Sequence, residues 1–251
     1  PKLLALHGLP NHRVAMNIDV TVVIPVYNEE LILEEALLEL LENLRAHQSA
    51  FEVIISANGC VDQTEAIAER LAASHPELIL HRCPEPDYGE ALKQGIERAR
   101  GRLVICEEID LCDDRFHRTA LAMLDADPEL AMVVGSKALP GARDRRPYFR
   151  RFATRVLNRM LRTATGWRGT DTHGLKALRR ELMLPVVERC ELRRDLFASE
   201  MVIRAFHMDC RVVEYPIELS EKRPPSIGLM RRVPKVLSDM GKLAVTVRRN
   251  K

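Results

Sequence analysis

The chain has 251 residues, of which 46% are hydrophobic and 4% aromatic, so it can bury a substantial core as one large or two small domains. Its 38 basic and 36 acidic residues leave a formal net charge of +2 at pH 7. No apolar run approaches the roughly 18 residues of a membrane span. No nucleic-acid-binding module is recognisable, so we expect no nucleic acid among the partners.

The six cysteines are scattered and form no CxxC pair, which favours free thiols in a reducing compartment over disulfides or a zinc site. The first residues lack the long apolar stretch and the small-residue cleavage site of a signal peptide. We therefore expect a cytoplasmic protein. The basic segments described below add a peripheral position on the inner membrane face to that expectation.

Strands and helices alternate along the first half of the chain, after a loose leader over residues 1–18. The predicted strands are 20–26, 51–56, 78–81, 103–106 and 131–135. The predicted helices between them are 29–47, with Asn28 as its N-cap, then 62–74, 89–100 and 114–125. This alternation predicts an α/β fold with a Rossmann-like, mainly parallel sheet and helices on both faces.

The alternation weakens after residue 136. The elements predicted there are helices 149–163 and 196–208, strand 211–215, and a basic amphipathic helix over 227–247. We expect one domain over residues 19–220, with halves 19–135 and 136–220. A basic, amphipathic interface tail over residues 221–251 follows it as a helical C-terminal extension.

Polar residues follow the first, second and fourth predicted strands, whose carboxyl ends meet at one edge of a parallel sheet. They are Tyr27, Asn28 and Glu29 after the first strand, Asn58 after the second, and Glu107, Glu108 and Asp110 after the fourth, with Pro25 and Gly59 beside them in the sequence. Such an edge is where open α/β sheets bind ligands. Each segment taken alone is equally consistent with helix caps and a solvated loop, but three together favour a site.

Glu108-Ile109-Asp110 places two carboxylates two residues apart directly after a strand. In extended backbone both would project to the same side, which suits a hard divalent cation that also holds phosphates. Asp113 and Asp114 are either additional ligands or caps of the next helix.

The sequence resembles family 2 glycosyltransferases with the GT-A fold through three segments in order: VTVVIPVYNEE, ISANGCVDQT and GEALKQGIERARGRLVICEEIDLCDD. Its later segments GSK (135–137), TDTHGLKAL (170–178) and FASE (197–200) are more loosely similar to the branch that contains dolichol-phosphate mannosyltransferase and other polyprenyl-phosphate sugar synthases. The resemblance implies transfer of a sugar, usually with inversion, from a nucleotide diphosphate sugar to a polyprenyl phosphate.

The resemblance also implies roles for individual residues. It places Pro25, Tyr27, Asn28, Glu29, Asn58, Gly59, Glu108, Ile109, Asp110 and Lys137 at the nucleotide sugar, and Lys176 at the acceptor phosphate. Asp110, with Glu108, would hold Mg²⁺ or Mn²⁺ between itself and the diphosphate, where the ion acts as a Lewis acid. The chain departs from the family pattern at Ala57 and Cys112, where the family often has an acid and a glutamine.

A phosphate acceptor is already anionic and requires no strong general base, whereas a hydroxyl acceptor requires one. Asp171 is the candidate base, with His173 beside it as an alternative base or additional metal ligand. A purely structural role of Asp171 in the turn before Gly174 is the competing interpretation. Glu200 is as well suited to holding a helix or loop as to touching substrate. A soluble hydroxyl acceptor and a non-catalytic nucleotide-binding protein stay open as alternatives.

Basic residues gather in two segments of the second half. Nine arginines and a single acid lie between Arg143 and Arg168, and the tail adds further basic residues around apolar ones. Arginine-rich faces are often only solubilising, but the scarcity of acids here equally favours attraction to phosphate groups. We expect Arg151, Arg155, Lys222 and Arg223 to meet the acceptor phosphate or an anionic membrane surface.

Overall fold

The computed structural model describes residues 18–48, 50–144, 148–219, 238–239 and 241–248. Nearly all of the predicted leader lies outside these ranges, and so does the part of the tail that contains Lys222 and Arg223. The predictions for those segments therefore stay predictions. Within the described ranges, no helix has the length and apolar character needed to cross a membrane.

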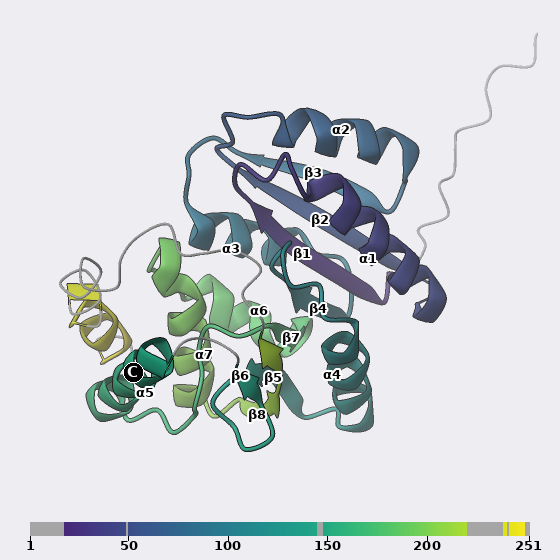
Figure 1. Cartoon of the computed structure of the whole chain (residues 1–251). Coiled ribbons are helices and arrows are strands. Elements are labelled where there is room, and N and C mark those ends of the chain that lie inside the picture. Colours follow the sequence, from purple (N-terminus) through teal and green to yellow (C-terminus); the bar gives the residue numbers. More distant parts are fainter. Residues whose placement is uncertain (1–17, 49, 145–147, 220–237, 240, 249–251) are drawn as a thin grey trace, which may run out of the picture.

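A seven-stranded sheet runs through the molecule in the order β3-β2-β1-β4-β7-β5-β8 (Figure 1). Its strands are β1 (Val20–Val26), β2 (Phe51–Asn58), β3 (Leu78–Cys83), β4 (Leu103–Cys106), β5 (Leu130–Ser136), β7 (Lys176–Arg179) and β8 (Arg211–Pro216). All are parallel except β7, which runs antiparallel to its neighbours β4 and β5. The short strands β6 (Arg143–Asp144) and β9 (Glu218–Leu219) form a separate parallel pair.

Helices cover both faces of this sheet. The helices on one face are α1 (Leu33–His47), α2 (Thr64–Ser74) and α4 (Asp114–Ala126). Those on the other face are α3 (Tyr88–Arg98), α6 (Arg180–Glu188) and α7 (Phe197–His207), which follows a 3₁₀ turn over Arg194–Leu196. Since β1 is covered on both sides, all seven of its residues are buried, which explains its unbroken apolar run. The predicted fold class is confirmed.

The C-terminal part of the described chain packs on the second face. α5 (Tyr148–Thr165) reaches the apolar cluster there through Leu161. Residues 241–248 are helical and reach the same cluster through Leu243 and Val247. Arg248 also donates a hydrogen bond to the carbonyl of Ala164 at 2.7 Å. The described end of the tail is therefore attached to the domain beside α5.

One local prediction at the end of β1 is wrong. Asn28 does not cap the first helix, because α1 begins at Leu33 and Asn28 has a φ of 54°. Pro25 lies inside β1, opposite Ser56 of β2. β4 pairs with β1 only as far as Val23, so the missing N–H of Pro25 removes no bond on that side.

The antiparallel direction of β7 matters for function. Because β7 runs against its neighbours, its first residue, Lys176, lies at the same edge as the last residues of β4 and β5. The loop of residues 170–175 therefore meets the ends of the parallel strands. This arrangement brings the second half of the chain to the edge at which the sequence predicts a ligand.

Candidate functional site

The loops after β1 and β2 hold each other through hydrogen bonds from backbone to side chain. Asn28 Oδ1 accepts from the N–H of Val61 at 2.9 Å, and Asp62 Oδ2 accepts from the N–H of Glu30 at 3.2 Å. Burial alone would raise the pKa of Asp62, but hydrogen bonds from Thr64 and Glu30 outweigh it and hold that pKa below its usual value. An ionised Asp62 thus fixes both loops relative to each other.

Tyr27 is the most open of the residues predicted to line the nucleotide site. It is 47% exposed just beyond β1, and Glu29 in the same loop is half-buried. Pro25, by contrast, is buried inside the strand. Of these three, only Tyr27 and Glu29 present side-chain surface at the edge, and their contact with a nucleotide stays a prediction.

Asn58 and Gly59 fix the neighbouring loop in this structure. Asn58 is 5% exposed, and its Oδ1 accepts from the N–H of Asp87 at 2.5 Å, which ties the end of β2 to the N-cap of α3. Gly59 has a φ of 63°, and a Cβ there would lie 2.7 Å from the backbone nitrogen of Pro86. Glycine is therefore required by the close approach of the loop before α3. The predicted nucleotide contacts of both residues remain untested.

Glu108, Ile109 and Asp110 follow β4 in a turn, not in the extended backbone that the sequence predicts. The N–H of Leu111 donates to the carbonyl of Glu108 at 2.9 Å. Ile109 packs into the core with 5% exposure, whereas Glu108 and Asp110 are half-buried. Burial, and then the charge of Asp110, raise the pKa of Glu108 to about 7. Two carboxylates therefore lie close together, and the nearby charges of Lys176 and Lys137 offset their repulsion only in part.

This pair fits one divalent cation that is shared with a ligand. Among the described residues, no three His, Cys, Asp or Glu side chains form a ready metal cluster. Mg²⁺, however, is commonly bound through one or two carboxylates together with substrate phosphates. Asp113 is not a further ligand here, because its Oδ1 caps α4 by accepting from the N–H of Phe116 at 3.0 Å.

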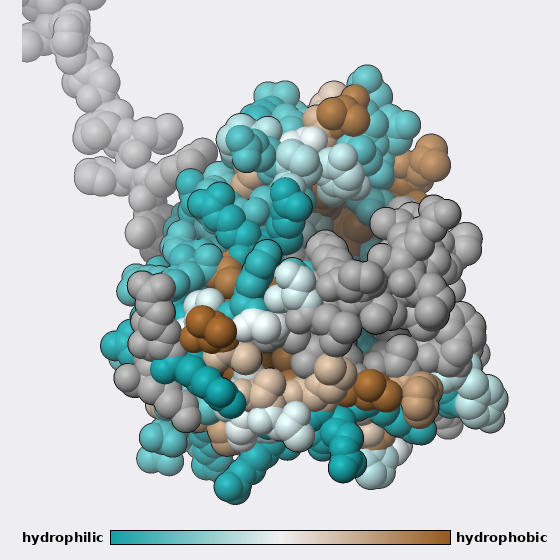
Figure 2. Space-filling model, turned by 90° about the vertical axis from the view of Figure 1, so that its left-hand side faces the viewer, coloured by the Kyte–Doolittle hydropathy of each residue, from teal (hydrophilic) through white to brown (hydrophobic). Residues whose placement is uncertain are grey.

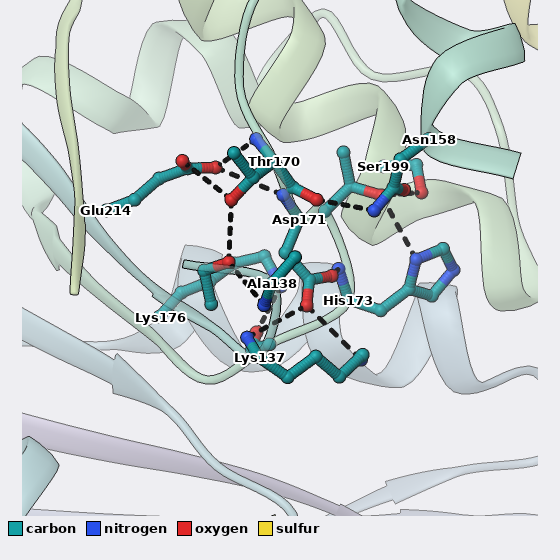
Figure 3. Close-up of polar contacts among 12 residues, drawn as sticks. Lys137, Ala138, Asn158, Thr170, Asp171, His173, Lys176, Ser199 and Glu214 are labelled. Carbon is teal, nitrogen blue, oxygen red and sulfur yellow. Dashed lines mark hydrogen bonds and ion pairs between the residues drawn. The ribbon is translucent and has the colours of Figure 1, made fainter. Parts of the chain in front are cut away.

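On the other side of the same edge, Lys137 and Asp171 form an ion pair (Figure 3). Nζ of Lys137, just after β5, lies 3.3 Å from Oδ2 of Asp171, and the two side chains are 12% and 2% exposed. Gly174 permits this approach, because a Cβ there would lie 1.6 Å from the carbonyl oxygen of Gly135. Two residues that are 34 positions apart are thus brought together at the edge.

The loop that carries Asp171 is held from three elements (Figure 3). Glu214 on β8 accepts from the N–H of Asp171 at 3.0 Å and from the hydroxyl of Thr170 at 2.9 Å. Asn158 on α5 donates to the carbonyl of Thr170, and the hydroxyl of Ser136 on β5 lies 2.7 Å from that of Thr170. The supporting roles of these three residues are not predicted from the sequence.

Asp171 is poorly suited to act as a general base. Burial alone would raise its pKa, but the charge of Lys137 and the hydrogen bond from the N–H of His173 outweigh it and keep that pKa below its ordinary value of 3.8. A carboxylate with a low pKa is a weak base. His173 is exposed, and its Nδ1 lies 3.0 Å from the hydroxyl of Thr172. The two predicted catalytic residues share a loop, and their catalytic roles stay predictions.

Lys176 and Glu200 are both directed inward. Lys176 is 3% exposed, its Nζ donates to the carbonyl of Gly174 at 2.7 Å, and burial lowers its pKa despite nearby acids. Its predicted contact with an acceptor phosphate is untested, and its buried position disfavours a direct one. Glu200 is fully buried and accepts from the N–H of Leu192 at 2.7 Å and from Arg204 at 2.6 Å. Of its two predicted roles, the structure supports holding a loop.

The family model described as Glycosyl transferase family 2 matches residues 21–184, which include the loops after β1, β2, β4 and β5 described above. The chain belongs to this family. The match confirms the resemblance that the three sequence segments indicate. The glycosyltransferase domain thus contains the carboxylate pair and the ion pair at one edge of its sheet.

Three curated relatives illustrate the similarity. Glycosyltransferase AglD of Haloferax volcanii is 30% identical over 228 residues, which are 89% of this chain and 36% of that protein. A dolichyl-phosphate beta-glucosyltransferase of Trichomonas vaginalis is 24% identical, with coverage of 90% and 72%. An undecaprenyl-phosphate 4-deoxy-4-formamido-L-arabinose transferase of Proteus mirabilis is 30% identical, with coverage of 65% and 50%. The chain thus spans only part of each relative.

Two solved structures share the fold. Glucosyl-3-phosphoglycerate synthase from Mycobacterium tuberculosis, in complex with Mn²⁺, uridine diphosphate and phosphoglyceric acid, superimposes with a TM-score of 0.66 at 18% identity, covering 90% of this chain and 78% of that one. The mannosyltransferase PcManGT from Pyrobaculum calidifontis, in complex with GDP-Man and Mn²⁺, gives a TM-score of 0.56 at 20% identity, covering 92% and 73%. At these identities the likeness concerns the fold, and it confirms the GT-A architecture.

Three arginines of α5 lie on the outside of the glycosyltransferase domain. They are Arg155, Arg159 and Arg162, all of which are exposed. Arg151 is half-buried and stacks over the ring of Tyr148, with its guanidinium carbon 4.2 Å from the ring centroid. None of them contributes to the ion pair of Lys137 and Asp171. Their predicted contact with phosphate or a membrane stays a prediction.

Proposed function

We infer that this domain transfers a sugar from a nucleoside diphosphate sugar to a polyprenyl phosphate. The observation that carries the proposal is one sheet edge where a pair of carboxylates, Glu108 and Asp110, lies beside an ion pair that engages Asp171. The names of two relatives, a dolichyl-phosphate and an undecaprenyl-phosphate sugar transferase, support the choice of acceptor.

On the donor side, Glu108 and Asp110 would hold Mg²⁺ or Mn²⁺. When bound, the ion neutralises charge on the leaving diphosphate and acts as a Lewis acid. Tyr27 is exposed at the same edge of the sheet as these two carboxylates. Its ring provides an aromatic surface for the nucleoside. Lys137, at 12% exposure, provides a cation that faces the same edge.

On the acceptor side, the state of Asp171 favours a phosphate over a hydroxyl. A hydroxyl acceptor loses a proton during attack and needs a general base, whereas a phosphate attacks as an anion. Asp171 has both oxygens engaged, by Lys137 and by the N–H of His173, and its pKa is lowered. Asp171, the candidate base for a hydroxyl acceptor, would therefore be a weak one, and a phosphate acceptor needs none.

The outer face of α5 suits a membrane that carries such an acceptor. Tyr148, Phe152 and Val156 recur every four residues, so they share a helix face, and they are 84%, 67% and 41% exposed. Arg155 and Arg159 are exposed on the same face, and α5 contains no acid that would neutralise them. Aromatic and apolar side chains mixed with arginines are typical of helices that lie at an anionic membrane surface.

Figure 2 views the molecule from the side on which α5 lies in Figure 1, and hydrophobic residues are exposed among hydrophilic ones in the lower half of that surface. Asn158, on a neighbouring and buried side of α5, contacts the loop of Thr170 and Asp171. A membrane against the outer face of α5 would therefore lie one helix away from the proposed acceptor loop.

The reaction is tested by incubating the full chain with guanosine, uridine and thymidine diphosphate sugars, Mg²⁺ or Mn²⁺, and a short polyprenyl phosphate. We expect one donor to give a lipid-linked sugar, detected by extraction and mass spectrometry. If no donor gives a lipid product while a soluble hydroxyl acceptor is glycosylated, the acceptor assignment is wrong. If nothing is transferred at all, the enzymatic proposal itself fails.

The membrane contact is tested separately by flotation with vesicles that contain phosphatidylglycerol, at low salt. We expect the wild type to float with these vesicles and not with pure phosphatidylcholine. Phe152→Ser should weaken binding by about 10- to 150-fold, because a buried aromatic side chain contributes about 1.5–3 kcal/mol. Val61→Ser, at an 85% exposed apolar residue far from α5, serves as the matched control. Equal flotation of both variants would rule out α5 as the contact.

A further inference from the structure

Glu107 and His117 form a buried polar pair beside the carboxylate turn. Glu107 follows β4 directly and is 1% exposed, and His117 on α4 is 3% exposed. Nε2 of His117 contacts Oε2 of Glu107. Burial of a carboxylate is unfavourable unless it is well hydrogen-bonded, and an apolar pair would fill the same space without that cost. The pair therefore points to a task that apolar side chains cannot perform.

The pair holds the next peptide group along the chain in place. The second carboxylate oxygen of Glu107 accepts from the N–H of Glu108 at 2.9 Å. The N–H of Glu107 itself donates to the carbonyl of Val23 on β1 at 3.0 Å. Glu107 is thus fixed to the sheet by its backbone and to α4 by His117. Since both of its oxygens are engaged and it has almost no surface, Glu107 does not contact a ligand itself.

The other end of the turn is fixed to the same helix. Asp113 Oδ1 accepts from the N–H of Phe116, and the carbonyl of Asp113 accepts from the N–H of His117, both at 3.0 Å. Residues 108–112 therefore form a short loop with both ends anchored at the start of α4. Glu108 and Asp110 lie inside this loop.

We propose that Glu107 and His117 are positioning residues, which hold this loop so that Glu108 and Asp110 stay close enough to share one divalent cation. The inference rests on the proposed role of those two carboxylates as metal ligands. Residues that orient metal ligands without touching the metal typically change metal affinity by roughly 10–100-fold when they are replaced. His117→Ala removes the support and leaves both carboxylates in place.

The experiment measures Mn²⁺ binding to the full chain, by the electron paramagnetic resonance signal of free Mn²⁺, in the presence of uridine or guanosine diphosphate. We expect His117→Ala to weaken Mn²⁺ binding at least tenfold. His117→Gln can place an amide nitrogen near the position of Nε2, so it should restore most of the affinity. Thermal unfolding without metal is recorded for every variant, and if His117→Ala does not fold, His117→Phe takes its place because it keeps the buried volume.

Glu52→Gln is the matched control. Glu52 is also a 1% exposed glutamate in a hydrogen-bond network, but it lies at the opposite edge of the sheet. The control should lower the unfolding temperature and leave Mn²⁺ affinity unchanged. If folded His117→Ala binds Mn²⁺ within twofold of the wild type, the positioning role is overturned. If the wild type binds no Mn²⁺ with either nucleotide, the proposed metal site fails as well, so the two failures are distinguishable.

Discussion

The two edges of the main sheet carry charged side chains in opposite arrangements. At the amino edge, Glu52 accepts hydrogen bonds from the hydroxyl of Thr21 at 2.8 Å and from Nε of Arg100 at 2.7 Å. At the carboxyl edge, the charge of Asp110 disfavours ionisation of its neighbour Glu108. Glu52 is thus stabilised as a carboxylate by groups of the chain itself, whereas ionised Glu108 and Asp110 together would be stabilised by a bound cation. If the proposed metal site is correct, this difference separates a side chain that stabilises the fold from side chains that bind a ligand.

The largest effect is expected from Asp110→Asn. It removes one proposed ligand, and a metal Lewis acid contributes several kcal/mol to transition-state stabilisation, so transfer should fall about 1000-fold or more. The free energy of unfolding should stay the same or rise slightly, because the repulsion with Glu108 disappears. Turnover of sugar transfer and thermal unfolding of the same preparation check both statements.

Asp114→Asn is the control for this change. Asp114 lies four residues further on, at the start of α4, where it pairs with Arg118 at 2.9 Å. Its replacement should leave transfer close to the wild-type rate, because such exposed pairs contribute little. Wild-type turnover of Asp110→Asn, or a loss in Asp114→Asn of similar size, would contradict the distinction between the two acids.

Glu52→Gln tests the amino edge and should show the reverse pattern. The substitution weakens the hydrogen bonds of a buried carboxylate to Thr21 and Arg100, so we expect a loss of about 1–3 kcal/mol in unfolding free energy. Turnover per folded molecule should be unchanged. Urea unfolding and transfer assays at a temperature where the variant is fully folded provide the measurement. A specific loss of turnover would break the comparison between the edges.

The sequence predicts the first half of the fold well because its signals are local. The ends of β1 to β5 agree within two residues with the predicted strands, since buried apolar runs and helical spacing mark them directly. β7 and α6 are missed. β7 is only four residues long, KALR, and its pairing depends on β4 and β5, which arrive from elsewhere in the chain. α6 then begins at the next residue without a separating turn.

The residues at the carboxyl edge also divide into those that the local sequence indicates and those that it does not. Glu108 and Asp110 are predictable because they directly follow a strand. Glu214 is not, since it lies 44 residues from its partner Thr170 and meets it only through the packing of β8 beside β5. His117 is also missed, because on a predicted helix nothing in the local pattern reveals that it faces a buried acid. The contacts that support this edge depend on tertiary packing, whereas the positions of Glu108 and Asp110 follow from the end of a strand.

A smaller effect is expected from Asp171→Asn, with a defined dependence on pH. The pKa of Asp171 lies below its ordinary value of 3.8 in the folded state, so its charge stabilises the fold fully above the unfolded pKa. This contribution is lost as the pH falls through the folded pKa. Loss of the ion pair with Lys137 should cost about 1–2 kcal/mol at pH 7.

The check is the difference in unfolding free energy between wild type and Asp171→Asn at several pH values. It should be constant near neutrality and shrink below about pH 4, as the wild-type carboxylate is protonated. With a polyprenyl phosphate acceptor, transfer should fall only modestly. A collapse of transfer with unchanged donor affinity would instead identify Asp171 as a base and favour a hydroxyl acceptor.

The smallest effect is expected from Arg102→Gln, at the surface of the amino edge. Arg102 bridges Asp19 at 2.9 Å and Asp125 at 2.8 Å, and about half of each side chain is exposed. Exposed pairs of this kind contribute about 0.5 kcal/mol, and salt screens them. The loss in unfolding free energy should therefore disappear in 1 M salt, whereas the loss in Glu52→Gln should persist because that carboxylate is buried. If both losses in unfolding free energy vanished in 1 M salt, burial would not explain how much Glu52 contributes to stability at the amino edge.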